Sequence, residues 1–266
     1  MPFPDTGPIQ LPDGRWACEE HHLQICGTCC CDYTVFDELS DNDADNDNWT
    51  NGSANDDGRY PTLFEPPPGA TTADVFIPSS INGQMAYVNP DDRSCCLVYT
   101  DGACLDNGLP GARGGCGIVF GPSLSDTKSS ARFRLEDQGP DGEIYPPTSN
   151  RAELRAVIAV MQSLCRQPAG RNTVVIAADS EYVVKGATEH LRTWVPRKWR
   201  TSLGKPVKNK DLWALLLELY GHLQRDGCEV KFWRIGREEN SEADALAKRG
   251  AAQAPVVGWT GHAMFV

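Results

Sequence analysis

The chain has 266 residues, of which 40% are hydrophobic and 23% charged, so it is long enough for one sizeable core with an appendage. No apolar run approaches the ~20 residues that a membrane-spanning helix needs. The first residues lack the basic start and apolar stretch of a secretory signal. We therefore expect an intracellular protein, nuclear or cytoplasmic, with reduced thiols and no membrane partner.

The net charge of −11 is unevenly distributed along the chain. Residues 1–93 hold 17 acidic and three basic residues, a charge of −14, whereas residues 94–266 hold 19 acidic and 22 basic residues, a charge of +3. Within the second part, residues 192–210 contain seven Lys or Arg and no acid. This basic run can contact phosphates even though the whole chain is acidic.

Residues 12–33 contain five of the eleven cysteines and two histidines. Two closely spaced pairs of possible metal ligands, separated by a short segment, are Cys18 with His21 and Cys26 with Cys29. This pattern is typical of a tetrahedral structural zinc site. A segment this short cannot fold on hydrophobic burial, so the metal would supply its folding energy. One of these ligands could be replaced by His22, Cys30 or Cys31. Disulfides are the alternative, which an intracellular setting disfavours.

Residues 34–92 are predicted to be an acidic, proline-rich linker that is mostly disordered. The stretch DELSDNDADNDNWTNGSANDDGRYP is polar and nearly free of aliphatic residues, and EPPPGATT adds prolines. Such a composition cannot bury enough apolar surface to offset the entropy of ordering the chain.

A folded domain is predicted over residues 93–254, followed by a C-terminal tail over 255–266. Apolar runs bounded by turn residues predict five strands, at 95–100, 114–122, 130–137, 173–179 and 228–236. Apolar residues at helical spacing predict four helices, at 150–166, 180–194, 209–227 and 241–253, the last begun by Asn240 or Ser241 as its cap. A strand meander followed by alternating helices and strands predicts an α/β fold, a five-stranded mixed sheet with helices on both faces.

Four acidic residues fall at the strand ends and helix starts of this domain. Asp101 and Asp179 each follow an apolar strand, where ligands bind in open α/β sheets. Glu153 and Asp244 are expected in the first turns of their helices. Any one of these acids is ordinarily a solvated cap, but converging carboxylates repel one another and persist only beside cations. Hard divalent ions fit such a set, and two ions ~4 Å apart can activate a water for phosphodiester hydrolysis.

Five motifs resemble type 1 ribonuclease H, in order and with suitable spacing: YTDGACLDNG, TSNRAEL, ADSEYVVKG, the run ending in PVKNKDLW, and EENSEADALA. The resemblance covers residues 95–252. It implies the ribonuclease H-like fold and an endoribonuclease that hydrolyses the RNA strand of RNA–DNA hybrids. It also implies two Mg²⁺ or Mn²⁺ ions held by the catalytic residues Asp101, Glu153, Asp179 and Asp244. We expect a monomer, and the sequence indicates no particular protein partner.

The resemblance further implies contacts with the hybrid. Asn107 and Asn150 fall on positions that contact its minor groove in the family, and Thr148 falls where the family holds a DNA phosphate. The basic run matches the basic protrusion that holds the DNA strand, with Trp194, Arg197, Lys198, Trp199, Arg200, Lys205 and Lys208. The two tryptophans could equally be core residues at a helix end, and the sequence leaves both interpretations open.

The chain departs from the family pattern at two places. Many members carry a flexible loop with a histidine before the last acid, whereas WRIGREENSEAD runs directly from strand to helix, with Arg237 and Glu238 as the nearest polar groups. We therefore expect activity that is slower or more dependent on the metal. Glu181 stands where the family often has an amide, and an ionised carboxylate only accepts hydrogen bonds, so substrate preference could differ. Residues 12–33 resemble a short leader found before ribonuclease H-like domains in filamentous fungi.

Two other functions fit the same fold. A non-catalytic nucleic-acid or protein-binding module is favoured by the lost histidine loop and by the acidic front, which could occupy the basic run. Against it, an idle site has no need for four repelling carboxylates. Another nuclease or a transposase is disfavoured by TSNRAEL and the basic run. Fold alone does not decide among these functions, and the four acids favour the hybrid nuclease.

Overall fold

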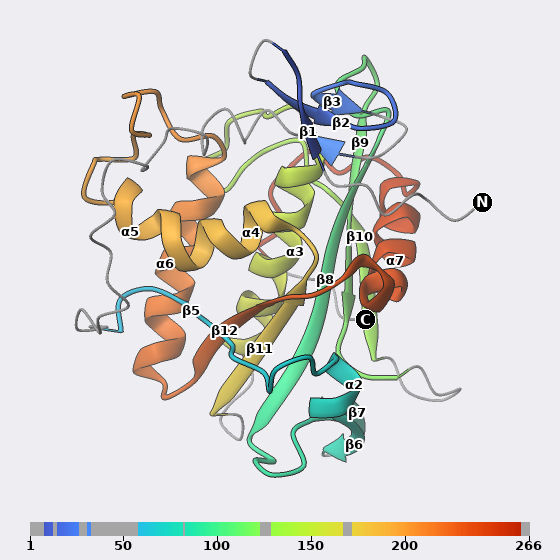
Figure 1. Cartoon of the computed structure of the whole chain (residues 1–266), viewed down its shortest axis with the longest axis vertical. Helices are drawn as coiled ribbons and strands as arrows, with labels where there is room; N and C mark the ends of the chain where they lie inside the picture. The colour runs from blue at the N-terminus through green and yellow to red at the C-terminus, as the bar shows by residue number, and fades with distance from the viewer. Residues whose placement is uncertain are drawn as a thin grey trace.

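The main body of the protein is an eight-stranded sheet with helices on both faces (Figure 1). The structure is a computed structural model, and it describes residues 8–12, 15–26, 31–32, 58–81, 83–122, 129–166 and 172–261. Two small sheets lie at one end of the long axis, built from β1 (Pro8–Gln10), β2 (Trp16–Cys18), β3 (Ile25–Cys26) and β4 (Cys31–Asp32). None of the described helices is long and apolar enough to cross a membrane.

All five predicted strands form and are neighbours in the main sheet. They are β8 (Cys95–Leu105), β9 (Arg113–Val119), β10 (Ser130–Arg134), β11 (Thr173–Ala178) and β12 (Glu229–Arg234). Strands β8, β9 and β10 pair antiparallel, while β11 pairs parallel with both β8 and β12. The sheet is therefore mixed, as predicted.

The prediction of a disordered linker over residues 34–92 is wrong from residue 58 onwards, and residues 33–57 lie outside the described part. Three more strands join the sheet, β5 (Thr62–Leu63), β6 (Ile77–Ile81) and β7 (Gln84–Val88), together with the short helix α2 (Thr72–Val75). Strand β5 extends the sheet beyond β12, and β7 pairs with β8. The sheet thus has eight strands rather than five. A few large apolar residues pack on the sheet and order this segment. The segment was predicted to be disordered because its average composition is dominated by acidic residues and prolines.

The predicted helices also form. They are α3 (Ser149–Leu164), α6 (Lys210–Arg225), α7 (Ser241–Ala251) and a helical segment in which α4 (Glu181–Lys185) and α5 (Leu191–Trp194) are joined by a π-helical turn, Gly186–His190. A 3-10 turn, Arg237–Asn240, leads directly into α7. We call this four-residue segment the REEN turn.

Side chains of the sheet alternate between two faces, and different elements cover each face. On one face, Val98 and Phe232 are buried in the large core formed with α3, α4 and α6. On the other face, Leu97 and Trp233 are buried in a smaller core that includes Phe76, next to α2. In Figure 1, α7 lies on the opposite side of β8 from α6.

Glycines in the sheet let two helices approach it closely. A Cβ on Gly102 of β8 would lie 2.0 Å from the backbone N of Glu153, and a Cβ on Gly117 of β9 would lie 2.2 Å from the carbonyl O of Ala243. A larger residue at either position would push α3 or α7 off the sheet. Because these helices carry two of the four acids, the glycines set how closely the acids approach Asp101.

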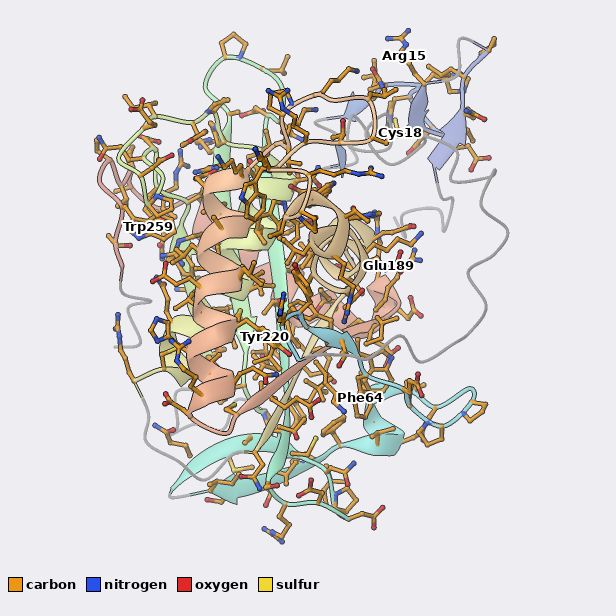
Figure 2. The ribbon with its side chains drawn as sticks, turned by 90° about the vertical axis from the view of Figure 1, so that its left-hand side faces the viewer. Arg15, Cys18, Phe64, Glu189, Tyr220 and Trp259 are labelled. Atoms are coloured by element: carbon orange, nitrogen blue, oxygen red, sulfur yellow. The ribbon has the colours of Figure 1, made fainter. Side chains whose placement is uncertain are left out.

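The C-terminal tail predicted for residues 255–266 is part of the fold as far as Gly261, and residues 262–266 lie outside the described part. The backbone N–H groups of Asp137 and Gln138 donate to the carbonyl oxygens of Val256 and Val257. The ring of Trp259, labelled in Figure 2, lies 4.3 Å from the guanidinium carbon of Arg155 on α3. The folded domain therefore extends beyond the predicted 93–254 at both ends.

Candidate active site

The four acidic residues come from four different elements. Asp101 lies in the middle of β8 rather than past its end, because antiparallel pairing with β9 continues the strand as far as Leu105. Asp179 directly follows β11, as predicted. Glu153 lies in the second turn of α3 instead of the first, while Asp244 lies in the first turn of α7, as predicted.

Asp101 interacts electrostatically with the other three acids. Burial raises the pKa of Asp101 well above its ordinary range, and the charges of Asp179, Glu153 and Asp244 raise it further. In the absence of a cation, such a cluster makes ionisation of its most buried member less favourable. A donor set made only of carboxylate oxygens suits Mg²⁺ or Mn²⁺ better than softer metals. The residues present therefore fit a divalent metal site.

Three of the carboxylates are held by neighbouring polar groups. The Ser180 hydroxyl donates a short hydrogen bond to Glu153. The Asn240 side chain donates to Asp179 Oδ1 at 3.0 Å, and Lys248 Nζ lies 2.8 Å from Asp244 Oδ2. Within the described ranges, no three His, Cys, Asp or Glu side chains are close enough together to hold a metal ion.

Asn240 is a site residue that the sequence did not indicate as such. It precedes α7, where we expected a helix cap, but its side chain makes no capping hydrogen bond. Instead it is 1% exposed and donates both to Asp179 and to the carbonyl oxygen of Thr100, the residue before Asp101. Its position four residues before Asp244 could have indicated a residue near the site. The direction of its side chain, however, depends on the tertiary structure.

The residues predicted to contact the minor groove and a DNA phosphate meet at the N-terminus of α3. Asn107, in the turn after β8, donates to Ser149 Oγ at 3.3 Å. Thr148 is the N-cap of α3, and its hydroxyl accepts a hydrogen bond from the backbone N–H of Arg151. Asn150 follows in the first turn and is 8% exposed. The structure thus brings the three predicted residues together.

The basic run is divided between surface and core. Its cations are exposed at Arg197, Lys198, Arg200, Lys205 and Lys208. Trp194 is only 4% exposed and packs edge-on against Trp213, with ring centroids 5.7 Å apart. Of the two interpretations that the sequence left open for Trp194, the structure therefore favours the core residue, because its ring packs against α6. Trp199 is half-buried against the same core.

The two departures from the family pattern have different surroundings. Glu181 is paired with Lys185 and with Arg234, whose Nη2 lies 3.3 Å from the carboxylate. Arg237 is exposed, and its Nε lies 3.8 Å from Asp179 Oδ2. Of the two residues suggested in place of the histidine, Arg237 contacts an acid of the site, while Glu238 is exposed in the same turn.

The predicted zinc ligands are only partly within the described residues. Cys18 is buried, and its carbonyl oxygen accepts a hydrogen bond from the His22 N–H at 2.8 Å, forming a tight turn. His21 is exposed in this turn. For Cys26 only the backbone is described, and Cys29 lies outside the described residues. Figure 2 shows Cys18 in the small strand cluster at one end of the molecule.

The mixed sheet with helices on both faces, and the acidic residues around the buried Asp101, define the class of protein, an α/β enzyme. The RNase H family model matches residues 93–252, more than half of the chain. The chain therefore belongs to the RNase H family. Residues 58–92, which complete the sheet, lie before the matched region.

Relatives in sequence agree with this assignment. A ribonuclease H of Paramagnetospirillum magneticum is 41% identical over 155 residues, covering 58% of this chain and 88% of that protein. A ribonuclease H of Neisseria meningitidis is 40% identical over 156 residues, covering 59% and 94%. The prototype foamy virus RNase H domain aligns with a TM-score of 0.43 and 22% identity over 59% of this chain and 93% of that chain. The assignment rests on the family match and the sequence relatives, because this structural similarity is low.

Proposed function

We propose that this protein is an endoribonuclease that hydrolyses the RNA strand of RNA–DNA hybrids. The observation that carries the proposal is the convergence of three charged carboxylates on the buried Asp101, in a chain of the RNase H family. Each neighbouring charge raises the free-energy cost of ionising Asp101, so the cluster destabilises the metal-free protein. Such a cost is typical of functional sites and is offset when cations bind.

We propose further that Asp101, Glu153, Asp179 and Asp244 hold two Mg²⁺ or Mn²⁺ ions. When bound, the ions supply an activated water and neutralise charge on the phosphodiester. Other properties of the chain favour metal binding by these carboxylates. Burial and neighbouring charge disfavour ionisation of Asp101 in the metal-free protein, and bound cations would offset that cost, while Asn240 keeps Asp179 in one orientation.

The hybrid is proposed to lie across the N-terminus of α3, where Asn107, Thr148 and Asn150 meet. Polar groups at this point suit the shallow minor groove of a hybrid and its sugar-phosphate edge. The exposed cations of the basic run would hold the DNA strand. All of these groups belong to one chain, so a monomer is sufficient for the site.

Arg237 is proposed to support the reaction in place of the missing loop histidine. Its guanidinium lies beside Asp179 and can donate hydrogen bonds to a phosphate oxygen. Unlike a histidine, it does not exchange a proton near neutral pH. The pH dependence of kcat should therefore lack an inflection near ~6.5, the ordinary histidine value, and such an inflection would contradict this role.

Cleavage assays test the proposed activity directly. Labelled RNA–DNA hybrid, double-stranded RNA and double-stranded DNA are incubated with the full chain and Mg²⁺ or Mn²⁺. We expect cleavage of the hybrid's RNA strand alone, abolished by Asp101→Asn and retained in Asp226→Asn, an exposed acid after α6. Equal cleavage by Asp101→Asn would show that the assignment of the acids is wrong. Binding without cleavage in either metal would instead favour a non-catalytic module.

We also propose that Cys18, His21, Cys26 and Cys29 bind one structural zinc ion. The thiolate and imidazole spacing supports this, as does the tight turn that begins at buried Cys18. Elemental analysis of the full chain should find zinc, and Cys18→Ser should lower its content while Cys165→Ser, an exposed thiol on the main domain, does not. Disulfide-linked cysteines without zinc would contradict the proposal.

A further inference from the structure

The segment before the family match is tightly packed against the sheet. Phe64, which follows β5, and Phe76, which follows α2, both pack on Trp233 of β12, with ring centroids 5.2 and 6.3 Å away. Figure 2 shows Phe64 beside β5, towards the end of the molecule opposite Cys18. Trp233 lies four residues before the REEN turn, so α2 is anchored close to the segment that connects β12 to α7.

One contact joins α2 directly to the REEN turn. The backbone N–H and the hydroxyl of Thr72 both donate to Glu239 Oε2, each at 2.7 Å. Thr72 is 4% exposed, and its hydroxyl also hydrogen-bonds Tyr99 of β8. These two hydrogen bonds are partly buried. Hydrogen bonds to a charged carboxylate oxygen are stronger than ordinary neutral ones.

The turn held in this way carries Asn240, the residue that orients a catalytic acid. Asn240 directly follows Glu239, and its side chain bonds Asp179 and the carbonyl oxygen of Thr100. The strands beneath are joined by a hydrogen bond from Ile235 N–H to the Ala178 carbonyl oxygen. Hydrogen bonds therefore join α2 to Glu239 and the next residue, Asn240, to Asp179.

We propose that Glu239 is a positioning residue for the catalytic site and that α2 acts through it. The contact with Thr72 fixes the REEN turn, and the fixed turn holds Asn240 against Asp179. The segment before the family match thereby becomes part of the catalytic apparatus without touching the substrate. The expected effect of Glu239 on catalysis rests on the proposed function, whereas its expected effect on the order of the REEN turn does not.

The test uses the full chain with Glu239→Ala, Thr72→Val and the double variant. We expect Glu239→Ala to lower kcat about tenfold, as loss of groups that orient metal ligands does. Thr72→Val keeps the backbone N–H donor and should lower kcat less, and KM should be unchanged in both. The double variant should be no slower than Glu239→Ala, because both changes break one contact. Glu239→Gln should restore most of kcat, because its amide oxygen can accept the same hydrogen bonds.

Backbone hydrogen exchange gives a second measurement that needs no activity. Exchange over residues 235–241 should be faster in Glu239→Ala and Thr72→Val than in the unmodified protein. Asp74→Asn is the matched control on α2, because Asp74 accepts from Thr71 and does not contact the turn. Glu242→Gln is the second control, because Glu242 is exposed in the first turn of α7, directly after the REEN turn. Both controls should leave kcat and exchange in the turn unchanged, even if Asp74→Asn lowers Tm.

Unchanged exchange and unchanged kcat in Glu239→Ala would overturn the proposal. So would an equal loss of kcat in Asp74→Asn and Glu239→Ala at equal Tm, since that loss would reflect destabilisation of α2 alone. If the unmodified protein cleaves no hybrid while Glu239→Ala still speeds exchange in the turn, the positioning contact stands and the proposed activity fails.

Discussion

At the scale of single residues, the buried charges of this protein are of two kinds. Arg155 and Glu136 form a pair whose side chains are 0% and 1% exposed, joined by two hydrogen bonds of 2.8 and 2.9 Å. Arg155 also lies between the rings of Phe133 and Trp259. Asp101, in contrast, is surrounded by charges of its own sign. The first arrangement stabilises the fold, and the second costs stability.

The buried pair makes stability depend on pH at the acidic end. Burial alone would raise the pKa of Glu136, but the hydrogen bonds and charge of Arg155, together with the Thr260 hydroxyl, lower it below its ordinary value. A carboxyl group with a lowered folded-state pKa contributes stability that is complete above its unfolded value, about 4.3. That contribution is lost as the pH falls through the folded-state pKa.

Arg155→Met should therefore lower the free energy of unfolding at pH 7 by about 3–5 kcal/mol, because it leaves a buried charge without its partner. Urea denaturation measures this change, and Arg225→Met, an exposed arginine at the end of α6, is the control. The double variant Arg155→Met with Glu136→Leu should be more stable than Arg155→Met alone. A further loss in the double variant would contradict the argument.

Asp101→Asn should stabilise the metal-free protein while abolishing activity. The raised pKa of Asp101 means that ionisation is harder in the folded state, so the folded protein loses stability as the pH rises above the ordinary aspartate value. Asparagine removes that cost. Thermal unfolding at pH 7 in a chelator should give a higher Tm for Asp101→Asn than for the unmodified protein. A lower Tm would indicate that the four carboxylates do not repel one another as described.

At the scale of elements, the position of α7 is set by glycines in β9. A Cβ on Gly115 would lie 1.9 Å from the backbone N of Ala251, and one on Gly117 would lie 2.2 Å from the Ala243 carbonyl oxygen. These are contacts with the backbone of α7 itself, which cannot move aside as a side chain can. Strand β9 therefore determines where Asp244, at the start of α7, lies relative to Asp101.

Gly117→Ala should lower both stability and activity. The added methyl group overpacks the interface of β9 and α7, at a cost of about 1–3 kcal/mol or more, and displaces Asp244. Chemical denaturation and a hybrid cleavage assay measure the two effects. Gly221→Ala is the control, because a Cβ there lies 3.7 Å from Arg225 Nη1 within α6, and it should raise stability by about 0.5–1 kcal/mol. Full activity in Gly117→Ala would show that α7 tolerates displacement.

At the scale of the whole molecule, charge is segregated between an acidic front and a basic run at one end of α6. The exposed cations of the basic run lie before and at the start of α6. Binding of a hybrid should therefore weaken with salt according to the number of phosphates that these cations contact.

Replacing Arg197, Lys198, Arg200 and Lys208 by serine should weaken hybrid binding and reduce its salt dependence. Each lost phosphate contact should lower the slope of log affinity against log salt by about 0.7–0.9. Binding is measured by fluorescence anisotropy over a salt series, with Asp101→Asn as the background to prevent cleavage. Arg225→Ser, about 20 Å further along α6, is the control. An unchanged slope in the serine variant would place the DNA strand elsewhere.

The local pattern of residues was enough to predict five strands, four helices and the four acids. Apolar periodicity reflects how a single element buries one face, and the motifs around Asp101, Glu153, Asp179 and Asp244 are short and contiguous. The helix at 180–194 was predicted on the same basis, although its π-helical turn was not. These features depend on neighbours in the chain, so the sequence alone determines them.

Contacts between distant segments required the tertiary structure. The composition around Phe64 and Phe76 predicted disorder, because it contains no information on their packing against Trp233, which is distant in the sequence. Trp194 could have belonged to the surface or to the core, and its packing on Trp213 decided for the core. In the sequence, Glu239 and Asn240 are ordinary residues at the start of a helix. Their hydrogen-bond partners, Thr72 and Asp179, are known only from the tertiary structure. The sequence by itself identified the four candidate acids, and the tertiary structure decided what holds them, because burial and hydrogen-bond partners arise only when distant segments pack together.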